Sequence, residues 1–436
     1  MTQPPLPAPT LSDLRALRES ETPSLFGLPP EVERLRDTVR DFAQNTLRPR
    51  VLANDQAPHD HFDWEAVRAG HEIGLLRLTL PEEFGGLGHG VLGTAVAMEE
   101  LAAVCASTAL VFGASMLGQT GVMLSGDPRL QARFLPPFLG DEPVLACNAV
   151  TEETAGCDLL RLDSLPLAED VATARRDGDE YVINGAKRYI TNGAVAEWAC
   201  VFANLEGHPG ATGLTAFVVP LDSPGVTRGD VADKMGYRAC LGTHLDFDDV
   251  RVPVENVIAG EGDGAFVSLL QTNQARASAA AISTGIARGA FEIAQRWAAE
   301  RRQGGQPLYR HQFTARKLAE MSAKIEASRL LYLQAAHQAD NRMPGPVFGP
   351  SVAKLFADRV AIEVAEESMS ILGARGYTRE FGLEKYVRES FGTRIFEGTP
   401  EVLALEITAA LYPGGVPAVP EGTASTPFPA LNGGSR

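Results

Sequence analysis

The sequence predicts an α+β fold in which a small β domain lies between two helical regions. Apolar residues recur at helical spacing in the first third of the chain. Short β-branched and aromatic runs with close turn signals follow from about residue 146, and long helical stretches return after Gly264. With 436 residues, 44% of them hydrophobic, the chain can bury the core of two or three packed units. We expect a flexible N-terminal extension, a helical domain, a β domain, a helical bundle and a disordered tail at 1–30, 31–145, 146–253, 254–412 and 413–436.

The N-terminal region is expected to be mostly helical. Apolar residues recur at helical spacing from Glu31 to Leu47, and Pro49 ends the pattern. Further helices, separated by Gly- and Pro-containing breaks, are expected at 64–73, 93–103 and 131–138.

The middle region has the pattern of strands joined by turns. In "EYVINGAKRYIT" the Asn184-Gly185 pair lies between two strand-like runs, which predicts a β-hairpin. Further strands are expected at 198–204, 214–220 and 244–253. About a hundred residues of this kind suffice for a small barrel or a two-sheet sandwich.

The C-terminal region has the pattern of a four-helix bundle. Helical stretches joined by short loops are expected at 265–302, 313–340 and 351–372. The fourth helix is expected to begin at Pro400 and to run to about Tyr412.

The segment "IFEGTPEV" places one carboxylate, Glu397, on an irregular turn before this last helix. Gly398 permits backbone geometry that other residues avoid, and Thr399 and Pro400 fit the N-cap and first helical position. The turn therefore aims the carboxylate, which makes Glu397 the best candidate for a catalytic base. The simpler interpretation is an acid favoured at the helix start by the helix dipole.

Composition excludes several classes of function. The net charge of −16 and the pI of about 5.0 disfavour binding to nucleic acid. The cysteines have neither the spacing of a zinc site nor the even number of a disulfide framework, which favours a reducing, cytoplasmic location; they are Cys105, Cys147, Cys157, Cys200 and Cys240. No leader or membrane span is expected in the first 30 residues. No GxGxxG motif follows a predicted strand and no P-loop motif is present, so a nucleotide cofactor would be bound in another way.

Three other segments contain candidate binding residues. "CNAVTEETAGCD", from Cys147, predicts either a strand with a capped turn or a loop that holds a polar ligand. Arg301 and Arg302 either cap the end of a long helix or hold a diphosphate. "ILGARGYTREFG", from Ile371, predicts a helix C-terminus with a Gly-containing loop that either caps the helix or contacts a ligand.

In combination these segments resemble the acyl-CoA dehydrogenase family of flavoproteins from about Glu31 to Tyr412. The matching motifs are "LPEEFGGLG", "VTEETAGCD", "YVINGAKRYITNG", "KMGYRA", "AERRQGGQPLYRHQ", "ILGARGY" and "IFEGTPEV", in the family's order. The resemblance implies the three-part fold predicted above and an FAD cofactor. It also implies a homotetramer or homodimer in which a neighbouring subunit completes each FAD site.

The resemblance also implies roles for individual residues. Glu397 matches the catalytic glutamate, which removes the α-proton of an acyl thioester while the β-hydrogen leaves as hydride to FAD. Relatives that carry the base on the long helix have it where this chain has Ala275. The implied flavin-facing residues are Val150, Thr151, Tyr189, Ile190 and Thr191, and Thr399 is a further implied cofactor-binding residue. Those implied for the diphosphate and adenine are Cys157, Arg301, Ser370, Gly373 and Ala374.

The chain departs from the family pattern at several of these positions. Tyr189 stands where Trp is usual above the flavin, and it keeps a flat aromatic ring. The other departures concern the diphosphate and adenine contacts; they are Glu153, Cys157, Gly304, Ser370 and Ala374.

Several functions stay open on the sequence alone. The leading one is dehydrogenation of an acyl-CoA, in fatty acid or amino acid catabolism, with electron-transferring flavoprotein as acceptor. An acyl group on a carrier protein would present the same thioester to Glu397. A flavin oxidase or monooxygenase on this fold is disfavoured by the presence of Glu397, and a DNA-associated flavoprotein by the acidic charge.

Overall fold

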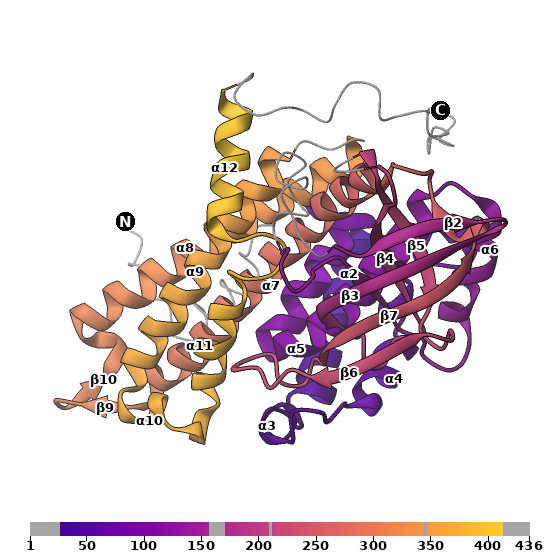
Figure 1. Cartoon of the computed structure of the whole chain (residues 1–436). Coiled ribbons are helices and arrows are strands. Elements are labelled where there is room, and N and C mark those ends of the chain that lie inside the picture. The colour runs from indigo at the N-terminus through magenta and orange to yellow at the C-terminus, as the bar shows by residue number, and fades with distance from the viewer. Residues whose placement is uncertain (1–26, 157–170, 209–211, 343–346, 413–436) are drawn as a thin grey trace.

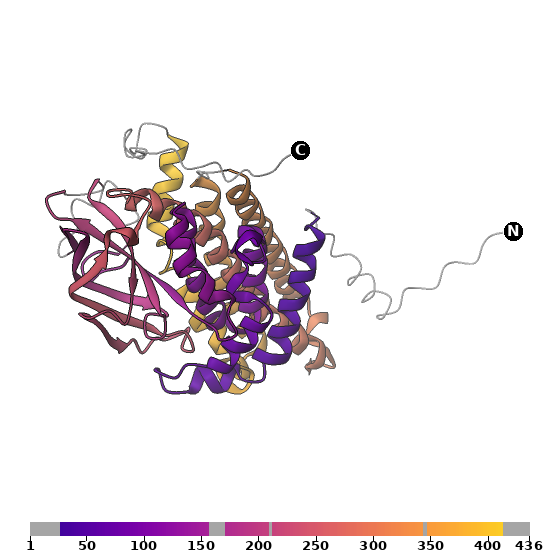
Figure 2. The same ribbon diagram turned by 90° about the vertical axis from the view of Figure 1, so that its right-hand side faces the viewer.

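The computed structural model describes residues 27–156, 171–208, 212–342 and 347–412. Helices, then a β domain, then helices follow along the chain, which confirms the predicted α+β class (Figure 1). Figure 2 shows the sheet on one side of the helices. Cys157, most of the predicted N-terminal extension and all of the predicted tail lie outside the described residues. The boundaries between the three domains stay a prediction.

The N-terminal region packs around one long internal helix, α5 (Gly90–Leu124). This helix is much longer than the predicted 93–103, because its sequence is apolar on all sides and lacks the one-sided pattern of a surface helix. It is long and apolar enough to cross a membrane, but most of it is buried inside the protein. Its backbone leaves helical geometry at Cys105. Around it lie α2 (Pro30–Phe42), a π-helical turn (Ala43–Leu47), α3 (Val51–Gln56), α4 (Trp64–Glu72) and α6 (Pro128–Phe134).

The β domain is one mixed sheet in the order β6-β7-β3-β2-β4-β5-β8, with β1 paired in parallel to β4. Residues of one face, such as Val201 and Phe217, form the core of the domain, whereas Trp198 and Phe202 pack against the helices. The strands are β1 (Ala146–Ala149), β2 (Thr173–Asp177), β3 (Glu180–Thr191), β4 (Trp198–Leu205), β5 (Leu214–Pro220), β6 (Val226–Val231), β7 (Gly242–Pro253) and β8 (Val257–Ile258).

The predicted hairpin at Asn184-Gly185 is wrong. Both residues lie inside the continuous strand β3, where the register with β7 shifts between Ile183 and Gly185. A Cβ at Gly185 would lie 2.6 Å from Ala172 Cα, so the glycine permits a bulge against a neighbouring strand. The turn lies earlier, between Asp177 and Glu180, which are paired across β2 and β3. Asn-Gly suits a bulge and a tight turn equally, because both need a positive φ.

The C-terminal helices differ from the predicted bundle in one respect. The three long helices are present as α7 (Gly264–Glu300), α8 (Gln312–Asn341) and α9 (Phe348–Leu372). Besides α8, the helix that packs against both α7 and α9 is α11 (Leu383–Gly392), which occupies the place expected for the fourth helix and which the sequence did not suggest. The expected fourth helix, α12 (Pro400–Leu411), packs against α9, extends away from the bundle (Figure 1) and buries only Leu403. The remaining elements are α10 (Ala374–Tyr377), β9 (Arg302–Gln303) and β10 (Gln306–Pro307).

Candidate active site

The turn between α11 and α12, residues 393–399, holds Glu397 in an unusual backbone conformation; we call it the Glu397 turn. Glu397 has φ 57° and Gly398 has φ 99°. A positive φ is uncommon for a residue with a side chain and is typical of functional sites. Thr399 accepts a hydrogen bond from the Val402 N–H at 3.5 Å, and Pro400 occupies the first turn of α12, which confirms the predicted cap.

Two buried cations hold the carbonyl groups of this turn. Arg276 Nε of α7 donates to the Glu397 carbonyl at 3.1 Å. Lys354 Nζ of α9 donates to the carbonyls of Thr393 at 2.9 Å and Gly398 at 3.2 Å. Buried carbonyls in an irregular turn need partners outside the turn, and these side chains supply them. The turn is therefore fixed to both long helices.

Both cations are paired with carboxylates, of which Asp358 is buried and Glu406 is partly exposed. Arg276 forms a two-pronged ion pair with Glu406 of α12, with Nη2 3.0 Å from Oε1. Lys354 Nζ lies 2.7 Å from Asp358 Oδ2. Asp358 also accepts a hydrogen bond from Ser283 of α7 at 2.8 Å. Because each buried charge is paired, the cluster can stay charged in the interior.

The environment raises the pKa of the Glu397 carboxyl. Burial, the largest effect, disfavours the charged form, while Arg276 and Lys354 oppose it by attraction. A carboxyl whose pKa is raised towards the working pH accepts a proton more effectively than an ordinary exposed glutamate. The local electrostatics therefore suit a general base.

The predicted flavin-facing residues of the β domain come together at one end of β3. The Arg188 N–H donates to the Thr151 carbonyl at 2.8 Å, which holds Val150 and Thr151 beside the strand end. Tyr189 has φ 57° and is 66% exposed, with its ring edge against His244. Ile190 is buried, and Thr191 is the last residue of β3.

The loop between β6 and β7 contacts both this strand end and the Glu397 turn. The Asn192 N–H donates to the Leu241 carbonyl at 2.9 Å. In the same loop, the Tyr237 ring packs edge-on against Phe396, with 5.8 Å between centroids. The turn that carries Glu397 and the residues around Tyr189 thus flank the same region of the molecule.

The residues predicted for the diphosphate and adenine lie at the other end of the helices. Arg301 follows α7, and Gly373, with φ 62°, follows α9. The two helix ends are adjacent, because the Arg375 guanidinium lies 5.2 Å over the Trp297 ring. At 1.5 Å per residue along α7, Arg301 is about 37 Å from Arg276. This group lies far from the region between Tyr189 and Glu397 within one chain. Its members are Arg301, Ser370, Gly373 and Ala374.

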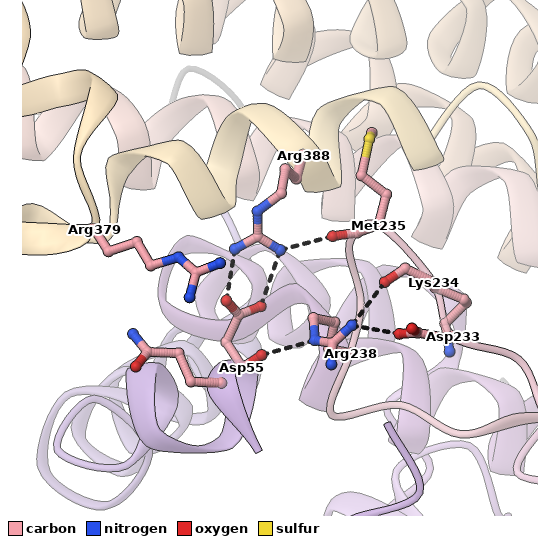
Figure 3. Close-up of a pocket in the computed structure, with 8 residues that line it drawn as sticks. Asp55, Asp233, Lys234, Met235, Arg238, Arg379 and Arg388 are labelled. Carbon is pink, nitrogen blue, oxygen red and sulfur yellow. Dashed lines mark hydrogen bonds and ion pairs between the residues drawn. The ribbon is translucent and has the colours of Figure 1, made fainter. Parts of the chain in front are cut away.

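A cavity of about 500 Å³ lies at the junction of the three regions (Figure 3). Charged side chains that line it hold the loop that carries Tyr237. Arg388 of α11 pairs with Asp55 of α3 and donates to the Met235 carbonyl at 2.7 Å. Arg238 donates to Asp233 at 2.6 Å and to the Asp55 carbonyl at 2.8 Å. None of the predicted site residues lines this cavity. Since its carboxylates are paired with its arginines, we interpret it as a structural junction.

Sequence reasoning missed both cations that hold the Glu397 turn, Arg276 and Lys354. A signal was present, because Lys354 and Asp358 are four residues apart within an otherwise mostly apolar stretch of helix. Charged residues are almost never buried unless they are paired. A lysine and an aspartate at this spacing in an apolar stretch therefore indicate a buried ion pair. The sequence could not show that the lysine also contacts a turn 39 residues later.

Comparisons with known proteins identify the class. The models for the N-terminal, middle and C-terminal domains of acyl-CoA dehydrogenase match residues 29–142, 147–250 and 262–412. These matches define an FAD-dependent oxidoreductase that acts on CH–CH bonds. The chain belongs to the acyl-CoA dehydrogenase family.

Individual relatives agree over nearly the whole chain. The cyclohex-1-ene-1-carbonyl-CoA dehydrogenase of Geobacter metallireducens is 38% identical over 376 residues, 86% of this chain and 96% of the relative. Butyryl-CoA dehydrogenase from Megasphaera elsdenii has a TM-score of 0.82 and 31% identity over 88% of this chain and 99% of that chain. A chain in a structure of the electron transferring flavoprotein of Acidaminococcus fermentans has a TM-score of 0.83 and 32% identity, over 89% and 99%.

The residues at the end of β3 fit a flavin ring. Tyr189 presents an aromatic face that the protein leaves exposed and holds with a strained backbone. A flat ring system would cover that face by stacking. Nearby on β1, the amide oxygen of Asn148 is buried and has no partner among the described residues. A polar cofactor edge would supply hydrogen-bonding groups to this region.

Proposed function

We propose that this protein converts an acyl-CoA to the 2-enoyl thioester, with Glu397 as the general base. The observation that supports the proposal is the Glu397 turn, which holds a carboxylate of raised pKa and contacts, through Phe396 and Tyr237, the loop that is hydrogen-bonded next to the end of β3. Ala275, at the alternative base position on α7, cannot accept a proton. Glu397 is therefore the base candidate that both geometry and chemistry support.

Glu397 supplies two functions to this reaction. Its carboxylate takes the proton from the α-carbon and is left as the neutral acid. Its backbone N–H makes no hydrogen bond within the described residues, so it is free to donate to the thioester oxygen as negative charge develops there. FAD, when bound, would supply the acceptor for the hydride that leaves the β-carbon, and loss of the α-proton and of this hydride gives the 2,3-double bond.

Val150, Thr151, Tyr189, Ile190, Thr191 and Thr399 would hold the flavin. The exposed ring of Tyr189 would orient the flavin by stacking. The hydroxyl of Thr191, at the end of β3, would donate a hydrogen bond to the flavin.

Anaerobic mixing of purified protein with a panel of acyl-CoAs tests this proposal. The protein should be yellow, and at least one of butyryl-CoA and cyclohex-1-ene-1-carbonyl-CoA should bleach the flavin. Glu397→Gln should keep the bound flavin and lose the bleaching. The matched control is Glu401→Gln, which changes a fully exposed acid four residues later. A colourless protein that stays inert with added FAD would refute the function.

The group around Arg301 supports a homo-oligomer, either a tetramer or a dimer. Because it is about 37 Å from Arg276, it serves the diphosphate and adenine of the FAD in a second copy. Arg301→Ala should therefore lower FAD affinity without changing the reduction rate of molecules that retain FAD. Light scattering that gives the mass of a monomer with FAD bound would contradict this arrangement.

Electron-transferring flavoprotein is the proposed acceptor, and the cytoplasm the proposed location. A structural neighbour comes from a study of that flavoprotein. The four cysteines in the described part of the chain are all free and buried, which suits a reducing compartment. Fast reduction of added electron-transferring flavoprotein, with slow reoxidation in air, would distinguish this function from an oxidase.

A further inference from the structure

We infer that Lys354 is a positioning residue for the catalytic base. Its ammonium group joins the two ends of the Glu397 turn and sets where the carboxylate stands relative to the α-carbon. The inference rests on the proposed role of Glu397, and it adds a residue from a different helix that contacts neither substrate nor flavin-facing residues.

The hydrogen bonds of Lys354 account for its whole donor capacity. An ammonium group has three N–H donors. Here the three acceptors are Asp358 Oδ2 at 2.7 Å, the Thr393 carbonyl at 2.9 Å and the Gly398 carbonyl at 3.2 Å. The lysine is 0% exposed, so water cannot replace any of them. The ammonium therefore fixes the positions of two carbonyls that lie on either side of Glu397.

Besides its hydrogen bonds, Lys354 contacts the residue that precedes the catalytic base, Phe396. Lys354 Nζ lies 5.6 Å from the centroid of the Phe396 ring, which is within the range of a cation–π interaction. Contacts at Thr393, Phe396 and Gly398 leave little freedom to the backbone of Glu397. Charge-assisted hydrogen bonds are about twice as strong as neutral ones, so a neutral side chain would hold the turn less tightly.

The ammonium group of Lys354 is tied to two helices besides the turn. Asp358, one turn further along α9, supplies the counterion, and Ser283 of α7 donates to the other oxygen of that carboxylate. The positioning unit is thus Ser283, Asp358 and Lys354, which together connect α7, α9 and the turn. Removing the lysine charge therefore acts first on the turn, at Thr393 and Gly398.

Lys354 also affects the protonation of the base. The charges that face Glu397 are Arg276 from α7 and Lys354 from α9, with Glu406 of α12 and Asp358 of α9 as their counterions. Loss of the ammonium leaves Arg276 as the cation that opposes burial. The pKa of Glu397 then rises further, and more alkaline solution is needed to ionise it.

The decisive experiment compares Lys354→Met with Lys385→Met. Lys385 is also a buried lysine paired with an acid four residues later, Glu389 at 2.6 Å, but it makes no hydrogen bond to the Glu397 turn. Both variants lose a buried charge, so both lose stability. The pH profile of kcat/KM and the FAD content are measured on the folded fraction, with an acyl-CoA that bleaches the wild-type flavin.

We expect Lys354→Met to lower kcat by about 10- to 100-fold and to move the acid limb of the profile upward by about one pH unit. FAD content per folded subunit and KM should change little. Lys354→Arg should restore part of kcat, and Lys385→Met should leave the acid limb where it is in the wild type. Equal losses in the two Met variants, or an unmoved acid limb in Lys354→Met, would overturn the inference.

A milder substitution keeps the test informative if Lys354→Met does not fold. Ser283→Ala removes the hydrogen bond to Asp358, together with one to the Ala279 carbonyl within α7, and should lower kcat with a smaller shift of the acid limb in the same direction. An unchanged kcat in this variant would count against the positioning unit. If Glu397→Gln still bleaches with acyl-CoA, the proposed base fails; if it does not bleach but Lys354 is without effect, only this inference fails.

Discussion

Gly398→Ala is predicted to impair catalysis more than it impairs folding. Gly398 has φ 99°, and a Cβ there would lie 3.1 Å from Arg276 Nη2 and 3.4 Å from Leu403 Cδ2. The positive φ alone costs an alanine about 1–2 kcal/mol. Arg276 must also give way by a few tenths of an ångström, and it is the donor to the Glu397 carbonyl.

The expected loss of activity follows from this displacement. A shift of about 1 Å at a reacting group can cost about 100-fold in rate, equivalent to about 2.7 kcal/mol in the barrier, and the smaller shift expected here makes that value the upper limit. We therefore expect kcat/KM to fall by about 10- to 100-fold, while the free energy of unfolding falls by about 1–2 kcal/mol. Urea denaturation and the steady-state rate with one acyl-CoA measure the two effects separately.

Gly207→Ala is the matched control for backbone strain. Gly207 has φ 82°, and a Cβ there would have no neighbour within 4 Å. The variant should lose a similar free energy of unfolding and keep wild-type kcat/KM. Wild-type kcat/KM in Gly398→Ala, or an equal loss in Gly207→Ala, would refute the claim that the turn geometry governs catalysis.

Three further predictions concern pH, the core and the cofactor. Because the pKa of Glu397 is raised, its carboxylate becomes protonated at a higher pH than that of an ordinary glutamate. The acid limb of kcat/KM should therefore lie above pH 4.5, and an acid limb below that value would contradict the prediction. Glu99 is paired with Arg288 and Arg329, and the net effect of its surroundings lowers its pKa to about 2 although burial acts in the opposite sense. Its contribution to stability is therefore present above about pH 4.5 and lost towards pH 2, and Glu99→Gln should cost about 3–5 kcal/mol in urea denaturation at pH 7 and far less at pH 2. Tyr189→Ala should raise the Kd for FAD about tenfold in a fluorescence titration, because an aromatic stacking contact is worth about 0.5–1.5 kcal/mol beyond the buried area; an unchanged Kd would exclude stacking on this ring.

Local patterns predicted the elements whose sequence follows a single rule. The strand β5 was predicted at 214–220, as observed, since a β-rich run is bounded by Gly213 and Pro220. The start of α12 follows from Thr399 and Pro400, which fix the cap through neighbours in sequence. The helix α11 was missed because its ten residues mix charged and apolar groups and half of them are buried, charged ones included.

The candidate site was predictable only where it depends on neighbouring residues. Glu397 stood out because Gly, Thr and Pro follow it, and these residues determine the turn. Its supports come from 121 residues away in the case of Arg276 and 39 in the case of the Lys354 contact to Thr393. No periodicity reports such contacts, since they arise only when α7, α9 and the turn pack together.

The rate of anaerobic flavin reduction tests the role of Glu397 most directly. Stopped-flow mixing of the holoenzyme with an acyl-CoA that bleaches it gives this rate for the wild type, for Glu397→Gln and for Glu401→Gln. General base catalysis contributes about 10²–10⁴-fold, so Glu397→Gln should be slower by that factor at equal flavin content, and Glu401→Gln should match the wild type. Reduction of Glu397→Gln within tenfold of the wild-type rate would show that another group removes the proton.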